Sequence, residues 1–283
     1  MIARQKTKIL LIGASSYVGA RLFVDLKEEF SIVGSYYSNP LYKDFIKLDI
    51  TNKDQVFKVF EKYKPESVVH AANNASSSWC QKNPHKAVEL NQKATTYIIK
   101  AANEIGAKVI YISSFAAIKP VNLYGKTKAA SEKIVQGAEK GYLILRPSLI
   151  VGFSPNTVND RPFNRILRNL EGKTEAVYDT SWKFQPTYLG HISEVIKVCL
   201  NKNLNQKIIP IAIKGLKSRF DLAKDILAYF NIPVKPIKEA NYFPVFKEDL
   251  GCLKQFNLSF YDYQTMIKTI VEEIKSKRKE VKK

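Results

Sequence analysis

The first 150 residues alternate short apolar runs with segments of helix length, and this alternation constrains the fold more than any other feature. Strands are predicted at Lys8–Gly13, Ser31–Tyr36, Phe45–Leu48, Ser67–His70, Lys108–Ile112 and Tyr142–Arg146. Helices are predicted at Tyr17–Glu29, Asn52–Tyr63, Pro84–Ile105 and Tyr124–Gly137. Parallel strands joined through helices form right-handed βαβ units. We therefore predict an α/β protein with a Rossmann-type, doubly wound parallel sheet.

After residue 150 the alternation loosens, because Gly152–Asn164 is rich in Pro, Asn and Gly and predicts a loop or a domain crossing. Further elements are predicted at Pro162–Glu171, His191–Asn201, Ile208–Ile213, Phe220–Phe230 and Asp262–Arg278. We assign residues 1–150, with about 186–213, to an NAD(P)-binding Rossmann domain. Residues 151–185 and about 214–283 would form a smaller C-terminal α/β lobe that binds the substrate, ending in a basic tail at 275–283.

The chain carries a net charge of +19, and the tail contributes six basic residues against one acid. A solvated helix end explains such a run more simply than a nucleic-acid or membrane contact, and the positive charge would help to attract an anionic cofactor or substrate. No apolar stretch is long enough to cross a membrane, and the N-terminus lacks the apolar core of a secretion signal. The three cysteines lie far apart, and they do not cluster with the three histidines at metal-ligand spacing. We expect a cytoplasmic protein without a metal site, a nucleic-acid partner or a membrane partner.

A glycine turn, Gly13-Ala14-Ser15-Ser16-Tyr17-Val18-Gly19, joins the first strand to the first helix. A helix that begins at such a turn offers free N–H groups to a dinucleotide pyrophosphate. The candidate residues for this contact are Gly13, Ser15, Ser16, Tyr17, Val18 and Gly19. The middle glycine is missing, however, since Ser16 and Tyr17 stand at the two positions where it is found. A tight turn without a ligand is the alternative.

The second strand ends without the acid that usually binds the ribose 2′-hydroxyl of NAD. Tyr36 and Ser38 are neutral there, and Lys43 is nearby. These side chains would accept a 2′-phosphate more readily than a carboxylate would. We therefore predict NADP as the cofactor, with NAD as the alternative; as a further alternative, these are simply exposed loop residues.

Tyr124 and Lys128 form a Y-x-x-x-K pair on one face of a predicted helix. A neighbouring ammonium would lower the pKa of the tyrosine and fit it for acid–base work on a carbonyl/alcohol couple. The spacing alone is common by chance. Its position is informative, because the preceding strand ends in Ser113-Ser114, at the sheet edge where ligands of such folds bind. We predict Ser114 as the donor that polarises the carbonyl, with Ser113 as the alternative for that role.

Several further motifs follow in order: Leu48-Asp49-Ile50-Thr51, Val69-His70-Ala71-Ala72-Asn73, Asn83-Pro84, Leu90-Asn91, Leu145-Arg146-Pro147-Ser148 and Gln185-Pro186-Thr187-Tyr188. Together with the glycine turn and the Ser114–Tyr124–Lys128 set, they resemble the extended short-chain dehydrogenase/reductase superfamily, above all its dTDP-4-dehydrorhamnose reductase branch. The resemblance implies that Asp49 and Ile50 flank the adenine. It places Ala71, Ala72, Asn73 and Ser113 along the cofactor, with Pro147 and Ser148 near the nicotinamide. It implies that Tyr124 and Lys128 are catalytic, that the second lobe binds a nucleotide sugar, and that the chain is a homodimer. Apart from the resemblance, the lysine of the Y-x-x-x-K pair could also hold the nicotinamide ribose.

The sequence departs from this branch at Phe115, because an acid usually follows the strand serine there. The Arg-Pro pair that such reductases carry near the C-terminal end is not evident at Tyr242–Leu253, and the Thr-Asp-Glu of the dehydratases is absent. The leading hypothesis is an NADP-dependent reductase of a 4-keto nucleotide sugar or similar carbonyl compound. A nucleotide-sugar epimerase that retains its cofactor, and a non-catalytic cofactor-binding subunit like that of methionine adenosyltransferase, are the alternatives.

Overall fold

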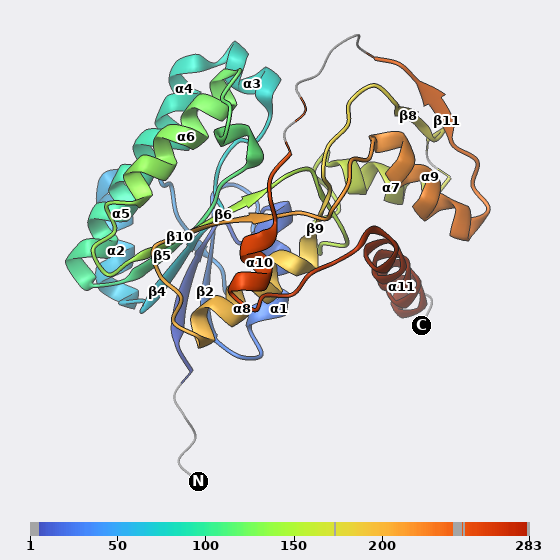
Figure 1. The fold of residues 1–283 in the computed structure, drawn as a ribbon. Coiled ribbons are helices and arrows are strands. Elements are labelled where there is room, and N and C mark those ends of the chain that lie inside the picture. Colours follow the sequence, from blue (N-terminus) through green and yellow to red (C-terminus); the bar gives the residue numbers. More distant parts are fainter. Residues whose placement is uncertain (1–5, 173, 240–244, 246, 282–283) are drawn as a thin grey trace.

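The centre of the molecule is a parallel sheet of seven strands in the order β10-β6-β5-β4-β1-β2-β3 (Figure 1). The strands are β1 (Lys8–Ile12), β2 (Ser31–Tyr36), β3 (Ile46–Lys47), β4 (Ser67–His70), β5 (Lys108–Ile112), β6 (Tyr142–Pro147) and β10 (Lys207–Ile211). The computed structural model describes residues 6–172, 174–239, 245 and 247–281. The chain builds the sheet outward from β1 in both directions, and this confirms the predicted doubly wound α/β fold.

Two layers of helices cover the sheet, because successive residues of a strand face opposite sides. Ile9 and Leu11 of β1 face one hydrophobic cluster, with α1 (Tyr17–Leu26) and α8 (Leu189–Asn201). Leu10 and Ile12 face the other, with α2 (Lys53–Tyr63), α5 (Ala94–Ile105) and α6 (Leu123–Val135). All four residues are buried. The wholly apolar β1 segment is thus explained by a strand that is covered on both faces.

The helix ends follow local sequence rules. Asn52 and Asn122 cap α2 and α6, each by accepting a hydrogen bond from the N–H of the third helical residue. Gly106 ends α5 in the left-handed conformation with φ of 65°. The predicted helix Pro84–Ile105 is divided into α4 (Pro84–Val88), a π-helical turn at Glu89–Lys93, and α5. Asn91 lies in this turn, where its buried amide binds both the N–H and the carbonyl of Asn74. That inward contact accounts for the break.

A smaller group of elements lies beside the carboxyl ends of the strands (Figure 1). It consists of α7 (Pro162–Leu170), β8 (Val177–Asp179), α9 (Arg219–Leu227) and β11 (Lys235–Ile237), with β8 and β11 paired in parallel. Four other elements are short: the paired strands β7 (Ile150–Val151) and β9 (Thr187–Tyr188), and the helices α3 (Ser77–Lys82) and α10 (Gly251–Gln255). The final helix is α11 (Tyr263–Val281). Within the described ranges, no helix has the length and apolar character that a membrane crossing requires.

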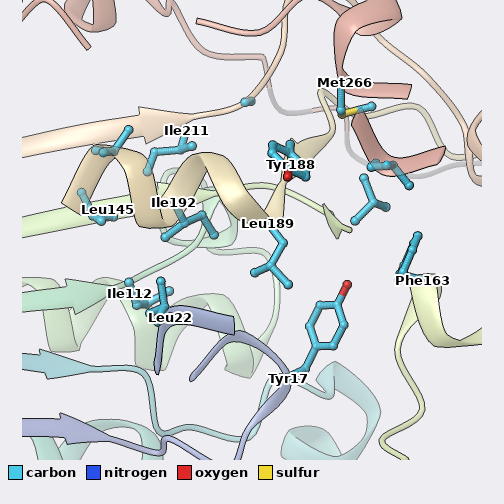
Figure 2. Close-up of a cluster of buried hydrophobic side chains, with 14 of the residues drawn as sticks. Tyr17, Leu22, Ile112, Leu145, Phe163, Tyr188, Leu189, Ile192, Ile211 and Met266 are labelled. Atoms are coloured by element: carbon cyan, nitrogen blue, oxygen red, sulfur yellow. The ribbon is translucent and has the colours of Figure 1, made fainter. Parts of the chain in front are cut away.

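The two parts share one hydrophobic core. Figure 2 shows Tyr17 of α1 pointing toward Leu189 of α8, with Phe163 of α7 close by. Arg21 of α1 adds a polar link, because its guanidinium lies 2.7 Å from Glu273 of α11. The helix that follows the glycine turn is therefore fixed against both the second group of elements and the C-terminal helix.

Candidate active site

The glycine turn sits at the carboxyl end of β1, where the chain reverses the direction in which it adds strands. Gly13 has φ of +83°, and a Cβ there would lie 2.9 Å from the backbone nitrogen of Ala72. Ser16 caps α1 by accepting a hydrogen bond from the N–H of Gly19 at 3.0 Å. Tyr17 and Val18 occupy the first turn, where helix geometry leaves N–H groups free. The turn thus fits a pyrophosphate through Tyr17 and Val18, while the Ser16 hydroxyl takes up one of the donors.

In place of a middle glycine the turn carries Tyr17, and the turn is hydrogen-bonded to the segment that follows β7. The Tyr17 hydroxyl donates a hydrogen bond to the carbonyl of Gly152, and the Ser154 hydroxyl donates to the carbonyl of Tyr17. Asn156 donates from its amide to the carbonyl of Ser15 at 2.6 Å. The segment predicted to cross between the lobes is therefore bound to the glycine turn at three points.

The residues predicted at the adenine end lie apart from the reacting groups. Asp49 accepts hydrogen bonds from the backbone and the hydroxyl of Thr51, and Ile50 is buried beside it. Tyr36 ends β2, and Ser38 is exposed in the loop that follows. Neither is an acidic residue, which agrees with the prediction that this end of the site accepts the 2′-phosphate of NADP.

Ser113 and Ser114 follow β5, but their side chains do different things. Ser113 is buried and donates a hydrogen bond to Glu132 of α6. Glu132 also pairs with Arg146, whose two donors lie 2.9 and 2.6 Å from its carboxylate oxygens. Ser114 accepts from the N–H of Ala116 and contacts the Tyr124 hydroxyl. The structure therefore brings Ser114 to the tyrosine and places Ser113 in a buried ion-pair network.

Tyr124 lies in the first turn of α6, with its side chain on the cavity. Burial of the hydroxyl raises its pKa to about 12, while the hydrogen bond with Ser114 and the charge of Arg161 act in the opposite direction. The prediction that a neighbouring ammonium lowers this pKa is wrong for the protein without a cofactor. Burial outweighs every nearby charge, so Tyr124 is protonated at neutral pH, as a proton donor must be.

Lys128 is completely buried one helical turn further along α6. Its ammonium donates to the carbonyl of Ile112 at 2.7 Å and lies 4.2 Å from the centre of the Tyr111 ring. Burial lowers its pKa to about 7, although Glu132 favours the charged form. The amine is thus directed beneath the end of β5, which explains why it does not lower the pKa of Tyr124.

A cavity of about 1010 Å³ connects the first turn of α1 with Ser114 and Tyr124. Ten of the predicted site residues line it: Ser16, Tyr17, Val18, Ala71, Asn73, Ser113, Ser114, Tyr124, Pro147 and Ser148. The others do not line it, namely Gly13, Ser15, Gly19, Tyr36, Ser38, Asp49, Ile50, Ala72 and Lys128. The carboxamide oxygen of Asn73 is buried there, and among the described residues it has no hydrogen-bond partner. It could therefore accept a hydrogen bond from a ligand. Phe115 also lines the cavity, so an aromatic ring occupies the position of the expected acid.

The cavity wall also carries residues that the sequence analysis missed. Four arginines line it: Arg161, Arg165, Arg168 and Arg219. Arg161 is the N-cap residue of α7, and Arg165 and Arg168 lie within this helix. Their spacing of four and then three residues places them on one helical face. That spacing was a usable signal. Arg219 comes from α9, with its guanidinium 5.3 Å from the Trp182 ring centre, and its approach to the others depends on the tertiary fold.

The chain is similar in sequence and in fold to several known proteins. The dTDP-4-dehydrorhamnose reductase of Aggregatibacter actinomycetemcomitans is 25% identical over 300 residues, covering 93% of this chain and 98% of that protein. Methionine adenosyltransferase 2 subunit beta of Bos taurus is 23% identical over 260 residues, covering 84% of this chain and 76% of its own. The crystal structure of dTDP-4-dehydrorhamnose reductase from Bacillus anthracis in complex with NADP superimposes with a TM-score of 0.81 at 22% identity, covering 96% of this chain and 100% of that one.

The family model that matches the chain is the RmlD substrate binding domain, over residues 7–247. The match spans both the sheet and the elements of the smaller lobe, and it agrees with the predicted membership of the extended short-chain dehydrogenase/reductase superfamily. The chain belongs to the RmlD substrate binding domain family.

Proposed function

We propose that this protein is an NADP-dependent reductase of a 4-keto nucleotide sugar, with NAD as the alternative cofactor. The observation that carries the proposal is the contact between Ser114 and Tyr124 on the wall of one cavity that also reaches the first turn of α1. Two similarities support the choice of cofactor and substrate class. One is the sequence similarity to the dTDP-4-dehydrorhamnose reductase of Aggregatibacter actinomycetemcomitans, and the other is the similarity in fold to the Bacillus anthracis reductase in complex with NADP. Bound NADPH would supply the hydride to the carbonyl carbon.

The side chains divide the remaining work. Ser114 would donate a hydrogen bond to the substrate carbonyl oxygen and polarise it. Tyr124, protonated because its pKa is raised to about 12, would transfer its proton to that oxygen as the alcohol forms. Tyr17 and Val18 would hold the pyrophosphate with backbone N–H groups. Lys128 would hold the nicotinamide ribose only after its amine leaves the carbonyl of Ile112.

The test is the consumption of NADPH, followed by absorbance, with a panel of 4-keto nucleotide sugars that includes dTDP-4-dehydrorhamnose. We expect stoichiometric oxidation by the wild-type protein and a loss of at least about 100-fold in Tyr124→Phe, the usual contribution of a general acid. Tyr229→Phe is the matched control, because Tyr229 is exposed and lies outside the cavity. Equal rates for Tyr124→Phe and the wild type would exclude the assigned role.

Two other outcomes identify the alternatives. Conversion of the sugar without net loss of the cofactor would indicate an epimerase. Binding of NADPH without turnover of any sugar would favour a non-catalytic subunit, a function that similarity to methionine adenosyltransferase 2 subunit beta brings into consideration. In that case the contact between Ser114 and Tyr124 would be a remnant.

A further inference from the structure

The C-terminal helix α11 brings a largely buried carboxylate into the body of the protein. The apolar face of α11 is buried in the larger hydrophobic cluster, through Met266, Ile267, Ile270, Val271 and Ile274. Glu273 lies next to this face, and its side chain is 19% exposed. A carboxylate that loses water costs free energy unless its oxygens gain other partners. The partners of Glu273 therefore show what holds this part of the helix in place.

Glu273 is bound from three other parts of the chain. A guanidinium nitrogen of Arg21 in α1 lies 2.7 Å from one carboxylate oxygen. The hydroxyl of Tyr188 in β9 donates to the same oxygen at 2.6 Å, and the backbone N–H of Phe153 donates to the other oxygen at 3.2 Å. Hydrogen bonds to a charged group are stronger than those between neutral groups. One side chain of α11 thus joins α1, β9 and the segment that follows β7.

Arg21 closes the same junction from the side of α1. Its side chain is 14% exposed, and its guanidinium donates to the carbonyl of Phe153 at 2.9 Å. The backbone of Phe153 is therefore held at both its N–H and its carbonyl, by two side chains that also bind each other. Lys277, one turn after Glu273, places its ammonium 5.9 Å from the centre of the Phe153 ring, within reach of a cation–π contact.

Phe153 stands between two residues that bind the glycine turn. Gly152 accepts a hydrogen bond from the Tyr17 hydroxyl at 2.5 Å, and Ser154 donates to the carbonyl of Tyr17 at 2.7 Å. A shift of Phe153 would therefore displace Tyr17, whose backbone N–H is assigned to the cofactor pyrophosphate. Arg21 acts on the same helix directly, because it follows Tyr17 by one turn of α1. The junction thus reaches the turn by two routes.

The helix itself does not touch the cavity at any residue for which the structure describes a side chain. An effect of Glu273 on the cofactor must therefore pass through Arg21 and Phe153. We propose that Glu273 is a positioning residue for the cofactor, whose carboxylate holds the glycine turn in its binding conformation through these two residues. A site held in its bound geometry binds more tightly, because less ordering is left to occur on binding.

The coupling must act in both directions. Two linked binding events change each other's equilibrium by the same factor, so a bound cofactor should also stabilise the docked position of α11. The proposal rests on the proposed function in one respect, namely that a nicotinamide dinucleotide binds at the glycine turn. It does not depend on which sugar is reduced.

The experiment compares Glu273→Gln with Glu272→Gln, which removes an equal charge from the exposed face of the same helix, where Glu272 pairs with Lys275. Dissociation constants for NADPH and NADH are measured without sugar, by fluorescence of the cofactor. We expect Glu273→Gln to weaken NADPH binding and raise its KM by at least about fivefold, with little change in kcat at saturating cofactor. Glu272→Gln should match the wild type. Circular dichroism shows whether each variant is folded at the assay temperature.

Two further measurements separate positioning from a general loss of stability. Tyr188→Phe removes one hydrogen bond to Glu273 and keeps the ring, so it should weaken NADPH binding in the same direction but by less. Hydrogen exchange is followed in residues 266–276 of α11 with and without saturating NADPH. The cofactor should slow this exchange in the wild type, and the slowing should be smaller in Glu273→Gln.

The outcomes separate this proposal from the proposed function, because cofactor binding is measured without sugar. If Glu273→Gln binds NADPH as tightly as the wild type does, the positioning role is overturned and the reductase assignment stands. If no sugar is reduced but Glu273→Gln still loses NADPH affinity, the positioning role stands and the reductase assignment fails.

Three other results would also overturn the role of Glu273. They are failure of the wild type to bind either NADPH or NADH, equal weakening by Glu272→Gln, and a fall in kcat at saturating cofactor as large as the rise in KM. The last result counts because positioning of the turn is complete once the cofactor is bound. If Glu273→Gln does not fold, Tyr188→Phe decides the matter, and an unchanged NADPH affinity in that variant would refute the proposal.

Discussion

The buried amine of Lys128 should make the stability of the protein without cofactor depend on pH. Burial lowers its pKa to about 7 from the ordinary 10.5. The unfolded chain therefore holds a proton on Lys128 that the folded protein has released, at every pH between these two values. Stability must rise with pH across that interval, because the unfolded state binds more protons there.

The size of the effect follows from the two pKa values. Each pH unit inside the interval changes the free energy of unfolding by at most about 1.4 kcal/mol. Half of the folded molecules still carry the proton at pH 7, so the gain between pH 7 and pH 9 is about 2 kcal/mol. Lys128→Met retains the length of the side chain but cannot titrate, so it should lose this gain.

The assay is urea unfolding at pH 7 and pH 9, followed by tryptophan fluorescence, with wild type and Lys128→Met compared. The quantity of interest is the difference between the two pH-dependent changes, which cancels the other groups whose titration does not depend on the charge of Lys128. The free energy of unfolding of the variant can differ from that of the wild type at both pH values, because the variant also loses the hydrogen bond to Ile112. Parallel changes in the two proteins would refute the account of a neutral, buried amine.

Three further predictions concern the framework of the site. Gly13→Ala should lower the free energy of unfolding by about 2 kcal/mol, because φ is +83° and the added Cβ would meet the backbone of Ala72 at 2.9 Å; an unchanged urea midpoint would show that the turn relaxes freely. Glu132→Gln should cost about 3 kcal/mol by leaving Arg146 without its carboxylate, and thermal unfolding equal to wild type would contradict a buried ion pair. Tyr17→Phe should cost about 1 kcal/mol through the lost hydrogen bond, and hydrogen exchange in 152–156 should accelerate; unchanged protection would argue against this attachment.

The sequence predicted the sheet well, because its strands are apolar on both faces and its helices carry local signals. Asn52, Asn122 and Gly106 end or begin helices for reasons that are contained in a few neighbouring residues. The strands β7, β8, β9 and β11 were missed, since two or three residues carry too little periodicity to be recognised.

The site was predicted less completely, because much of it depends on contacts between distant segments. The position of Tyr124 beside Ser114 followed from motif order, but the direction of the Lys128 amine did not. Burial of that amine depends on how α6 packs beneath β5, which spacing alone cannot express. Arg219 reaches the cavity from an element 58 residues beyond Arg161, and nothing local to either residue connects them.

The most direct test of the proposed reduction follows a single hydrogen atom. The protein is given NADPH that is deuterated at the transferred position of the nicotinamide, together with the 4-keto nucleotide sugar, and the product is analysed by mass spectrometry and proton NMR. The account predicts a product that carries one deuterium on the former carbonyl carbon, and no such product from Tyr124→Phe in the same time. A sugar product without deuterium, formed while the cofactor remains reduced, would contradict it.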